Sequence, residues 1–511
     1  MNAVYREGKT VATGAQNPTG PFACKSIEAL QADAASHGLR RALGPLHLVM
    51  FGIGCILGAG IYVLPGTAAA NYAGPAVMIS FVLAGTACAL TALCYAELAS
   101  TMPVSGSSYS YCYASLGEVF AWSLGWILML EYTLASSSLA VGFSSYLLSL
   151  LRNFGIVVPA VLATPLVGST GGFSLNFIAV LAVAAVTAVL CAGVRQSAGV
   201  NAFLVAVKVT VIVVVIAVGV GAIDPANWTP FVPPHEEGFA FGWPGILRAA
   251  SILFFAYLGF ETVSTAASEA RNPQRDLPIG ILGALLVCTL LYFAVAAVLT
   301  GVVPYRELGV ADPVALAVDR MGHPGVAIFV KVGALMGLSS VLLVNAYGQS
   351  RITFQMSRDG MLPALFSRVH ERFRTPYRGL IVLGVISATC AAFFPIQVLA
   401  DFVSLGAGLA FATVCFSTMW LRAKRPDLPR PFRVPLGGFT IGRAWIGYIP
   451  ATALVFCIAM ILPVLIDIGL KAAAGQPLMA IFLGVYLAVG VVLYAAYGRR
   501  NSTLQRAGAP A

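Results

Sequence analysis

Segment 52–60, with the sequence GIGCILGAG, has a composition that frees backbone groups for ligand binding. Its four glycines each disfavour helix by about 0.5–1 kcal/mol relative to alanine. The segment lies inside an apolar run long enough to cross a bilayer, where irregular backbone persists only if it is buried in protein or lines a cavity. A break here exposes the amides of Gly58, Ala59 and Gly60, which suit a small carboxylate. The alternative, close helix packing through small residues, stays open.

Lys208 is a charge in the middle of a second apolar run, NAFLVAVKVTVIVVVI. A charge at the centre of a span costs from about 2.5 to over 10 kcal/mol, so it needs a reason to be there. A lysine removed from water can exchange its proton during a working cycle. Its ammonium can also replace a sodium ion by donating to carbonyls of a broken helix. The alternatives are a permanent structural hydrogen bond or a side chain that snorkels to the membrane surface.

Three glutamates also fall within predicted spans. Glu261 follows a glycine in LGFETVST and is either a ligand for exposed amides or a structural cap. Glu131 faces a run of small hydroxyl residues and is expected to line a pocket or to pair with a partner. Glu97 lies near a helix end, as a gate or capping residue. Asp401 and Asp467 are expected near helix ends, in contact with water.

The composition places these residues in a membrane protein. Of the 511 residues, 59% are hydrophobic and 10% are charged, against about 25% charged in soluble domains. Apolar stretches of spanning length predict an all-α integral membrane protein with twelve transmembrane helices. The predicted spans are 44–69, 73–101, 117–150, 174–194, 198–221, 243–268, 276–303, 324–356, 378–394, 397–421, 446–470 and 477–498.

The net charge of +10 is explained by topology rather than by nucleic acid. Most of the 30 Lys and Arg residues fall in segments on one side of the predicted spans, which by the positive-inside rule places both termini in the cytoplasm. We expect a cytoplasmic tail over 1–40, a membrane domain over 41–498 and a second cytoplasmic tail over 499–511. No Cys or His spacing indicates a metal, and no motif indicates a cofactor.

A second interrupted helix is predicted in the sixth span, where Gly259 and Glu261 fall in mid-membrane. Interruptions in the first and sixth spans, five spans apart, are typical of a five-plus-five inverted repeat with a binding site near the midplane. The repeat is inferred from these two interruptions, because the halves show no strong internal identity.

Four motifs together resemble the amino acid–polyamine–organocation superfamily, in particular the bacterial relatives of its cationic amino acid transporter branch. They are GIGCILGAGIYVLPG, CYAELASTMPVSGSSYSYCYASLGE, FFAYLGFETVSTAASEARNPQRDLP and YGQSRITFQMSRDGMLP. The similarity covers about residues 38–498. It implies a LeuT-like fold, with broken helices 1 and 6 in the inverted repeat and two additional helices.

The resemblance also implies roles for individual residues. Gly58, Ala59 and Gly60 correspond to the break that binds the substrate carboxylate. The backbone oxygens that hold the substrate ammonium correspond to those of Ile53, Phe255, Ala256 and Leu258, and the aromatic cover corresponds to Phe255. The side-chain subsite corresponds to Glu131 and Asn345. The proton-coupling group corresponds to Lys208, with Ser339 and Ser340 as its partners.

The sequence therefore predicts an importer of amino acids at the inner membrane that works by proton-coupled symport and alternating access. An amino acid or amine exchanger is the alternative within transport, and a non-transporting amino acid sensor is an alternative from another class. An enzyme is not expected, because no catalytic constellation is present. The predicted partners are an amino acid, a proton and the lipid bilayer. A small single-span membrane protein is left open as a further partner.

Overall fold

Helices occupy each of the twelve predicted spans. The computed structural model describes residues 20–27, 43–104, 106–167, 174–193, 198–373 and 375–507. Within these residues, nine helices are long and apolar enough to cross a membrane, and Pro45–Ile56, Phe177–Cys191 and Tyr377–Phe393 are shorter apolar helices. The chain is thus a mostly helical, multi-pass membrane protein, while the inverted repeat stays a prediction.

The first and sixth spans each consist of several short helices. The first contains α2 (Pro45–Ile56), α3 (Ala59–Tyr62), α4 (Leu64–Ala68) and the π-helical turn η1 (Ala69–Ala73). The sixth contains α10 (Gly242–Leu253), the 3-10 turn η5 (Phe254–Tyr257), α11 (Thr262–Thr265) and the 3-10 turn η6 (Ala266–Glu269).

The other spans are single helices, because a backbone in lipid must satisfy its own hydrogen bonds. They are α5 (Val77–Thr101), α7 (Glu118–Asn153), α8 (Phe177–Cys191), α9 (Ala198–Val220), α12 (Pro273–Val302), α14 (Pro324–Arg358), α15 (Tyr377–Phe393), α16 (Ile396–Lys424), α17 (Tyr448–Ala473) and α18 (Leu478–Leu493). Shorter helices lie between or after them: η2 (Gly74–Ala76), α6 (Ser107–Ser115), η3 (Ala160–Leu162), η4 (Pro225–Trp228), η7 (Tyr305–Leu308), α13 (Pro313–Arg320), η8 (Ala364–Phe366), η9 (Tyr494–Gly498), α19 (Arg499–Asn501) and α20 (Thr503–Ala507).

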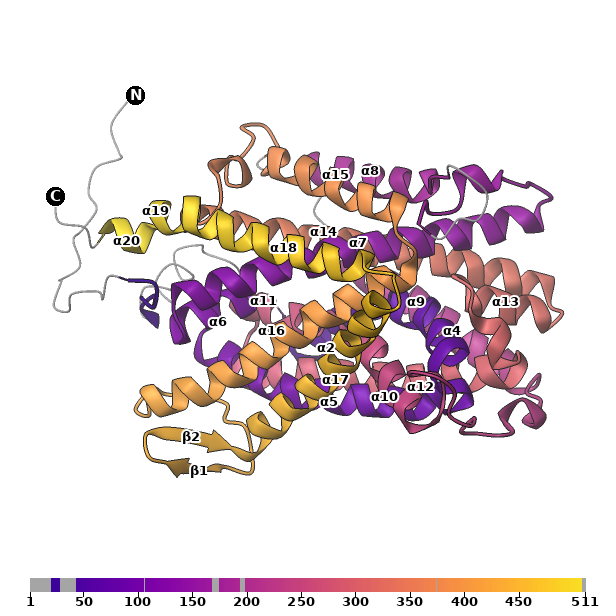
Figure 1. The fold of residues 1–511 in the computed structure, drawn as a ribbon, viewed down its shortest axis with the longest axis horizontal. Coiled ribbons are helices and arrows are strands. Elements are labelled where there is room, and N and C mark those ends of the chain that lie inside the picture. Colours follow the sequence, from indigo (N-terminus) through magenta and orange to yellow (C-terminus); the bar gives the residue numbers. More distant parts are fainter. Residues whose placement is uncertain are drawn as a thin grey trace.

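Most helices run along the long axis of the molecule (Figure 1). The third span, α7, packs against both α14 and α16, and α5 packs against α12. The two interrupted spans are buried mainly around their breaks, over residues 52–69 and 248–261. Helices α8 and α15 lie side by side at one rim of the bundle in Figure 1, and α18 lies along its outside.

Two features were not predicted by the sequence. A two-stranded antiparallel sheet, β1 (Gly438–Ile441) with β2 (Ala444–Gly447), interrupts the all-α pattern between α16 and α17. Part of each predicted tail also packs against the membrane domain: the Val119 amide donates to the Pro21 carbonyl at 2.9 Å, and the Thr503 amide donates to the Asp359 carbonyl at 3.0 Å. The rest of the tails, 1–19, 28–42 and 508–511, lies outside the described residues.

Glu97 joins the end of α5 to the end of α16. Its carboxylate accepts a hydrogen bond from Nε of Arg422 at 2.7 Å and from the Val434 amide at 2.8 Å. Arg430 adds a longer contact at 3.5 Å. The Glu97 carboxylate is therefore engaged by several partners. These contacts fix the position of the chain that leads from α16 into the sheet.

The expectation that Asp401 and Asp467 are solvated is wrong for both residues. Nη2 of Arg248, whose side chain is fully buried in α10, donates to Asp401 at 2.8 Å and to Asp467 at 2.9 Å. The side chains of Asp401 and Asp467 are only 4% and 14% exposed. The sequence places the three residues in the sixth, tenth and eleventh spans, so their proximity depends on tertiary packing that no local pattern reveals. The cluster ties α10 to α16 and α17.

Replacing Arg248 by alanine is expected to destabilise the protein strongly. The substitution leaves the buried Asp401 without its partner, which typically costs about 3–5 kcal/mol, and it leaves Asp467 with Lys471 alone. The matched control is Arg320→Ala, because Arg320 pairs with Glu307 at the surface with both side chains about half exposed. Exposed pairs of this kind contribute about 1 kcal/mol or less. Thermal unfolding in detergent measures both variants, and equal melting temperatures would contradict the role given to the Arg248 cluster.

Candidate functional site

The first span is broken where the sequence predicts. Helix α2 ends at Ile56, residues 57 and 58 are irregular, and α3 begins at Ala59. Gly58 has φ −141° and ψ −131°, a conformation outside the helical region. Among the described residues, no acceptor contacts the backbone amides of Gly58, Ala59 and Gly60. These amides are the donors that the break makes available.

The sixth span is also broken, around Gly259. Its φ of +115° requires glycine, and a side chain there would lie 2.8 Å from the carbonyl group of Cys55. The carboxylate of Glu261 accepts a hydrogen bond from the Gly259 amide at 2.8 Å. The Tyr132 hydroxyl contacts the same carboxylate at 3.4 Å. Glu261 therefore satisfies a backbone group that the break leaves without a helical partner.

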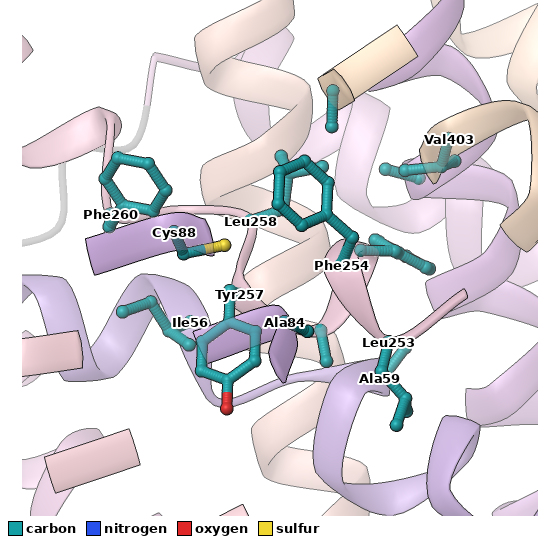
Figure 2. Packing of buried hydrophobic residues seen from close by; sticks show 14 of the residues in the cluster. Ile56, Ala59, Ala84, Cys88, Leu253, Phe254, Tyr257, Leu258, Phe260 and Val403 are labelled. Atoms are coloured by element: carbon teal, nitrogen blue, oxygen red, sulfur yellow. The ribbon is translucent and has the colours of Figure 1, made fainter. Parts of the chain in front are cut away.

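The two breaks face each other at very short range. A methyl group on Gly60 would lie 2.5 Å from Cα of Ala256, so the fourth glycine of GIGCILGAG is needed for this approach. The Tyr292 hydroxyl of α12 shares its proton between the carbonyls of Ile56, at 2.9 Å, and Ala256, at 2.7 Å. Figure 2 shows Ile56 and Ala59 beside side chains of the sixth span, including Phe254 and Tyr257.

A narrow cavity lies between the two breaks and the helices α7 and α14, with about 450 Å³ of space that no atom fills, including space open to solvent. The lining residues are Cys55, Ile56, Gly58, Ala59, Gly60, Tyr132, Ala135, Leu139, Phe255, Ala256, Leu258, Gly259, Glu261, Thr262, Val341, Val344 and Asn345. The lining thus consists mainly of apolar side chains and backbone atoms, with a few polar side chains.

The cavity brings together most of the sequence-predicted substrate residues. Gly58, Ala59 and Gly60, then Phe255, Ala256 and Leu258, and also Asn345 and Glu261, all belong to its lining. Ile53 does not line it, and its carbonyl accepts a helical hydrogen bond from the Leu57 amide at 2.9 Å. Glu97 is likewise outside the lining, in its contact with Arg422.

Glu131 lies behind the cavity rather than in its wall. It is 1% exposed and packs against Gly406 of α16, and its Oε2 has no hydrogen-bond partner. Asn345 does line the cavity, and its Nδ2 donates to the Tyr132 carbonyl and to the Ser136 hydroxyl, both at 2.8 Å. The Asn345 amide group therefore connects α14 to α7 at the edge of the cavity.

Lys208 contacts the first broken helix from outside the cavity. Its Nζ donates to the Gly54 carbonyl at 2.9 Å, and the residue is 2% exposed. No described carboxylate forms an ion pair with it. The predicted partners Ser339 and Ser340 instead donate to carbonyls of their own helix, those of Leu335 and Gly337. Among the described residues, the hydrogen-bond acceptor of the Lys208 ammonium is thus one backbone carbonyl of α2.

Several lining residues were missed in the sequence. Tyr132, Ala135 and Leu139 recur at helical spacing on α7, and Val341 and Val344 precede Asn345 on α14. This spacing places each set on one helix face, but many faces in a membrane bundle have the same pattern. Tyr292 was missed for another reason, since a lone tyrosine in an apolar helix does not reveal what its hydroxyl contacts.

Tyr292→Phe is expected to destabilise the protein by about 1–3 kcal/mol, because it leaves two buried carbonyls without their shared donor. Tyr448→Phe is the control, since Tyr448 is 54% exposed at the start of α17. The comparison is the melting temperature of each variant in detergent. A Tyr292 variant as stable as the Tyr448 variant would show that the hydrogen bonds from Tyr292 to the two breaks do not stabilise the protein.

Comparisons with known proteins agree with this architecture. The family model described as amino acid permease matches residues 43–494. The chain is 41% identical to the methylthioribose transporter of Bacillus subtilis over 485 residues, 95% of this chain and 99% of the relative. It is also 41% identical to a branched-chain amino acid permease of the same organism over 488 residues, again 95% and 99% of the two chains. A vacuolar cationic amino acid transporter of Arabidopsis thaliana is 39% identical over 391 residues, 76% of this chain and 65% of the relative. The chain belongs to the amino acid permease family of membrane transporters.

Proposed function

We propose that this protein imports neutral aliphatic amino acids across the cell membrane by proton-coupled symport. The observation that carries the proposal is the pair of facing helix breaks around one cavity, with Lys208 bonded to the first broken helix just before its break. Residues 41–498 form the transport domain, and both termini lie in the cytoplasm. The transporter alternates between states open to either side.

The breaks offer complementary groups to the two charges of an amino acid. The amides of Gly58, Ala59 and Gly60 donate to the substrate carboxylate. The carbonyls of Ile56 and Ala256 each keep a lone pair beyond the one that Tyr292 occupies, and these accept from the substrate ammonium. Backbone groups therefore suffice for the part that all amino acids share.

Lys208 couples the proton to the position of the first broken helix. With its proton, the ammonium donates to the Gly54 carbonyl and holds α2 against α9. Without the proton, the neutral amine makes a weaker hydrogen bond, because charge-assisted bonds are roughly twice as strong as neutral ones. The equilibrium between transport states thus depends on whether Lys208 carries a proton.

The remaining lining favours an aliphatic substrate side chain. Ala135, Leu139, Val341 and Val344 present apolar surface, and Glu131, which could attract a cationic group, is outside the lining. A branched-chain permease among the relatives fits this preference. The methylthioribose transporter suggests a second candidate, a thio-sugar, which has neither carboxylate nor ammonium for the breaks. An obligate exchanger is the alternative mechanism, with Lys208 purely structural.

In proteoliposomes, an inward proton gradient is expected to drive accumulation of labelled leucine, and Lys208→Ala is expected to abolish the response to the gradient. The physical reason is that alanine cannot carry the coupling proton. Lys331→Ala is the control, since Lys331 is also a buried lysine but pairs with Asp319 away from the breaks. Uptake that ignores the gradient and requires internal amino acid would favour exchange instead.

Substrate choice is tested separately by competition. Unlabelled leucine, isoleucine and valine are expected to inhibit leucine uptake much more strongly than arginine or methylthioribose. Burying a full aliphatic side chain contributes about 1.5–3 kcal/mol, whereas a guanidinium group would enter a mainly apolar lining in which the carboxylate of Glu261 already accepts from the Gly259 amide. Stronger inhibition by arginine would place the cationic amino acids first, and stronger inhibition by methylthioribose would replace the amino acid by the thio-sugar.

A further inference from the structure

The two-stranded sheet between α16 and α17 has an exposed apolar face. Figure 1 shows β1 and β2 at the rim of the bundle, beside α16 and α17. The pairing places Phe439 opposite Ile446 and Ile441 opposite Ala444. Phe439 and Ile441 are 43% and 61% exposed. An isolated hairpin of this kind is marginally stable in water, and an exposed apolar strand edge is an aggregation hazard there.

The two faces of the sheet are chemically different. Successive side chains in a strand point to opposite faces, so Trp445 lies on the face opposite to Ala444 and Ile446. The Trp445 ring lies 4.2 Å from the guanidinium carbon of Arg422 on α16, which makes this the inner face. The outer face is therefore made of Phe439, Ile441, Ala444 and Ile446. It contains no polar side chain.

Two exposed arginines flank strand β1 along the chain. Arg433 precedes β1, and Arg443 lies in the turn between the strands. Both are exposed, and neither forms an ion pair with a residue that the structure describes. By contrast, Arg422 and Arg430 nearby are engaged by Glu97. The hairpin thus combines an apolar surface with two free guanidinium groups.

The hairpin adjoins the ends of two candidate spans, α16 and α17. Helix α17, a candidate span, begins at Tyr448, directly after β2, and Phe439 contacts the Tyr448 ring at 5.8 Å between centroids. Phe416 and Trp420 are exposed on the adjoining stretch of α16. Aromatic side chains of this kind gather at membrane–water interfaces. The outer face therefore continues the lipid-exposed surface of the bundle.

We propose that the 438–447 hairpin is a binding site for anionic phospholipid, with its outer face among the acyl chains and Arg433 and Arg443 on the headgroup phosphates. Amphipathic elements bind membrane surfaces through this combination of apolar burial and attraction to anionic lipid. The leaflet is the one on the side of the described terminal segments, because Nζ of Lys424 at the end of α16 lies 3.9 Å from Sγ of Cys24.

The hairpin also leads directly to the contacts of Glu97. Trp445 stacks on the same Arg422 that donates to Glu97 at the end of α5. A lipid bound to the outer face therefore supports the inner face against the ends of α5 and α16. The proposal is independent of the transported substrate and of proton coupling.

The depth of the outer face is measured by spin labels in liposomes of phosphatidylglycerol and phosphatidylcholine. One label is placed at Ile441→Cys and the matched label at Thr440→Cys, its neighbour on the opposite face. The background carries Cys24→Ser and Cys191→Ser, since the other cysteines are buried. Molecular oxygen is enriched in the membrane, whereas a charged nickel complex stays in water.

The collisions of the two labels with oxygen and with the nickel complex either support or overturn the proposal. We expect the label at 441 to collide mainly with oxygen and the label at 440 to collide more with the nickel complex. A label at 441 that collides mainly with nickel would place the outer face in water and overturn the proposal. Protection of 441 from both reagents would show that protein, such as a second copy of this chain, covers the face, and this would also overturn it.

The choice of anionic lipid is tested with a fluorophore at Ile441→Cys and brominated quenchers. Brominated phosphatidylglycerol is expected to quench more than brominated phosphatidylcholine at equal mole fraction. Arg433→Gln and Arg443→Gln should each reduce this preference about fivefold, from the usual contribution of one basic residue near an anionic surface. Equal quenching by the two lipids in the parent protein would contradict a site for anionic phospholipid.

Discussion

The structure depends on how the backbone groups at two helix breaks find hydrogen-bond partners inside a membrane. Each unpaired amide or carbonyl there costs several kcal/mol, so a break is tolerated only where side chains or a ligand complete it. Here Tyr292 bonds to carbonyls of both breaks, Lys208 to Gly54 and Glu261 to Gly259. The side chains that complete the breaks come from α12, α9 and the sixth span itself. Among the residues that the structure describes, the amides at the start of α3 have no acceptor, so they remain available to a ligand in the cavity.

The surrounding helices hold this arrangement through polar contacts buried in the bundle. The Arg248 cluster ties the first half of the sixth span to α16 and α17, and Asn345 ties α14 to α7 beside the cavity. Such ties between spans are costly to break because both partners are removed from water. They join helices that lie far apart in the sequence.

Sequence reasoning succeeded where a local pattern has one structural meaning. Apolar length predicts the spans, a glycine-rich segment predicts the first break, and Gly259 with Glu261 in mid-span predicts the second, where φ is positive. It failed where meaning depends on partners distant in the chain. Asp401 and Asp467 look like ordinary residues at helix ends until Arg248 is placed between them. Glu131 lies on the same helix as the cavity residues Tyr132 and Ala135, yet one step around the helix directs it to α16. The hairpin was missed because its short strands lie between an arginine-rich loop and the eleventh span, where no alternating pattern longer than four residues is present.

The central claim, that backbone groups of the two breaks bind both charges of an amino acid, is tested most directly by calorimetric binding to the purified protein. Leucine is compared with 4-methylpentanoic acid, which lacks the ammonium group, and with 3-methylbutylamine, which lacks the carboxylate. Hydrogen bonds to charged groups contribute about 1.5–3 kcal/mol each, so each analogue is expected to bind at least about tenfold more weakly than leucine. An analogue that binds as tightly as leucine would contradict the account, because the backbone groups assigned to the missing charge would then have no part in recognition.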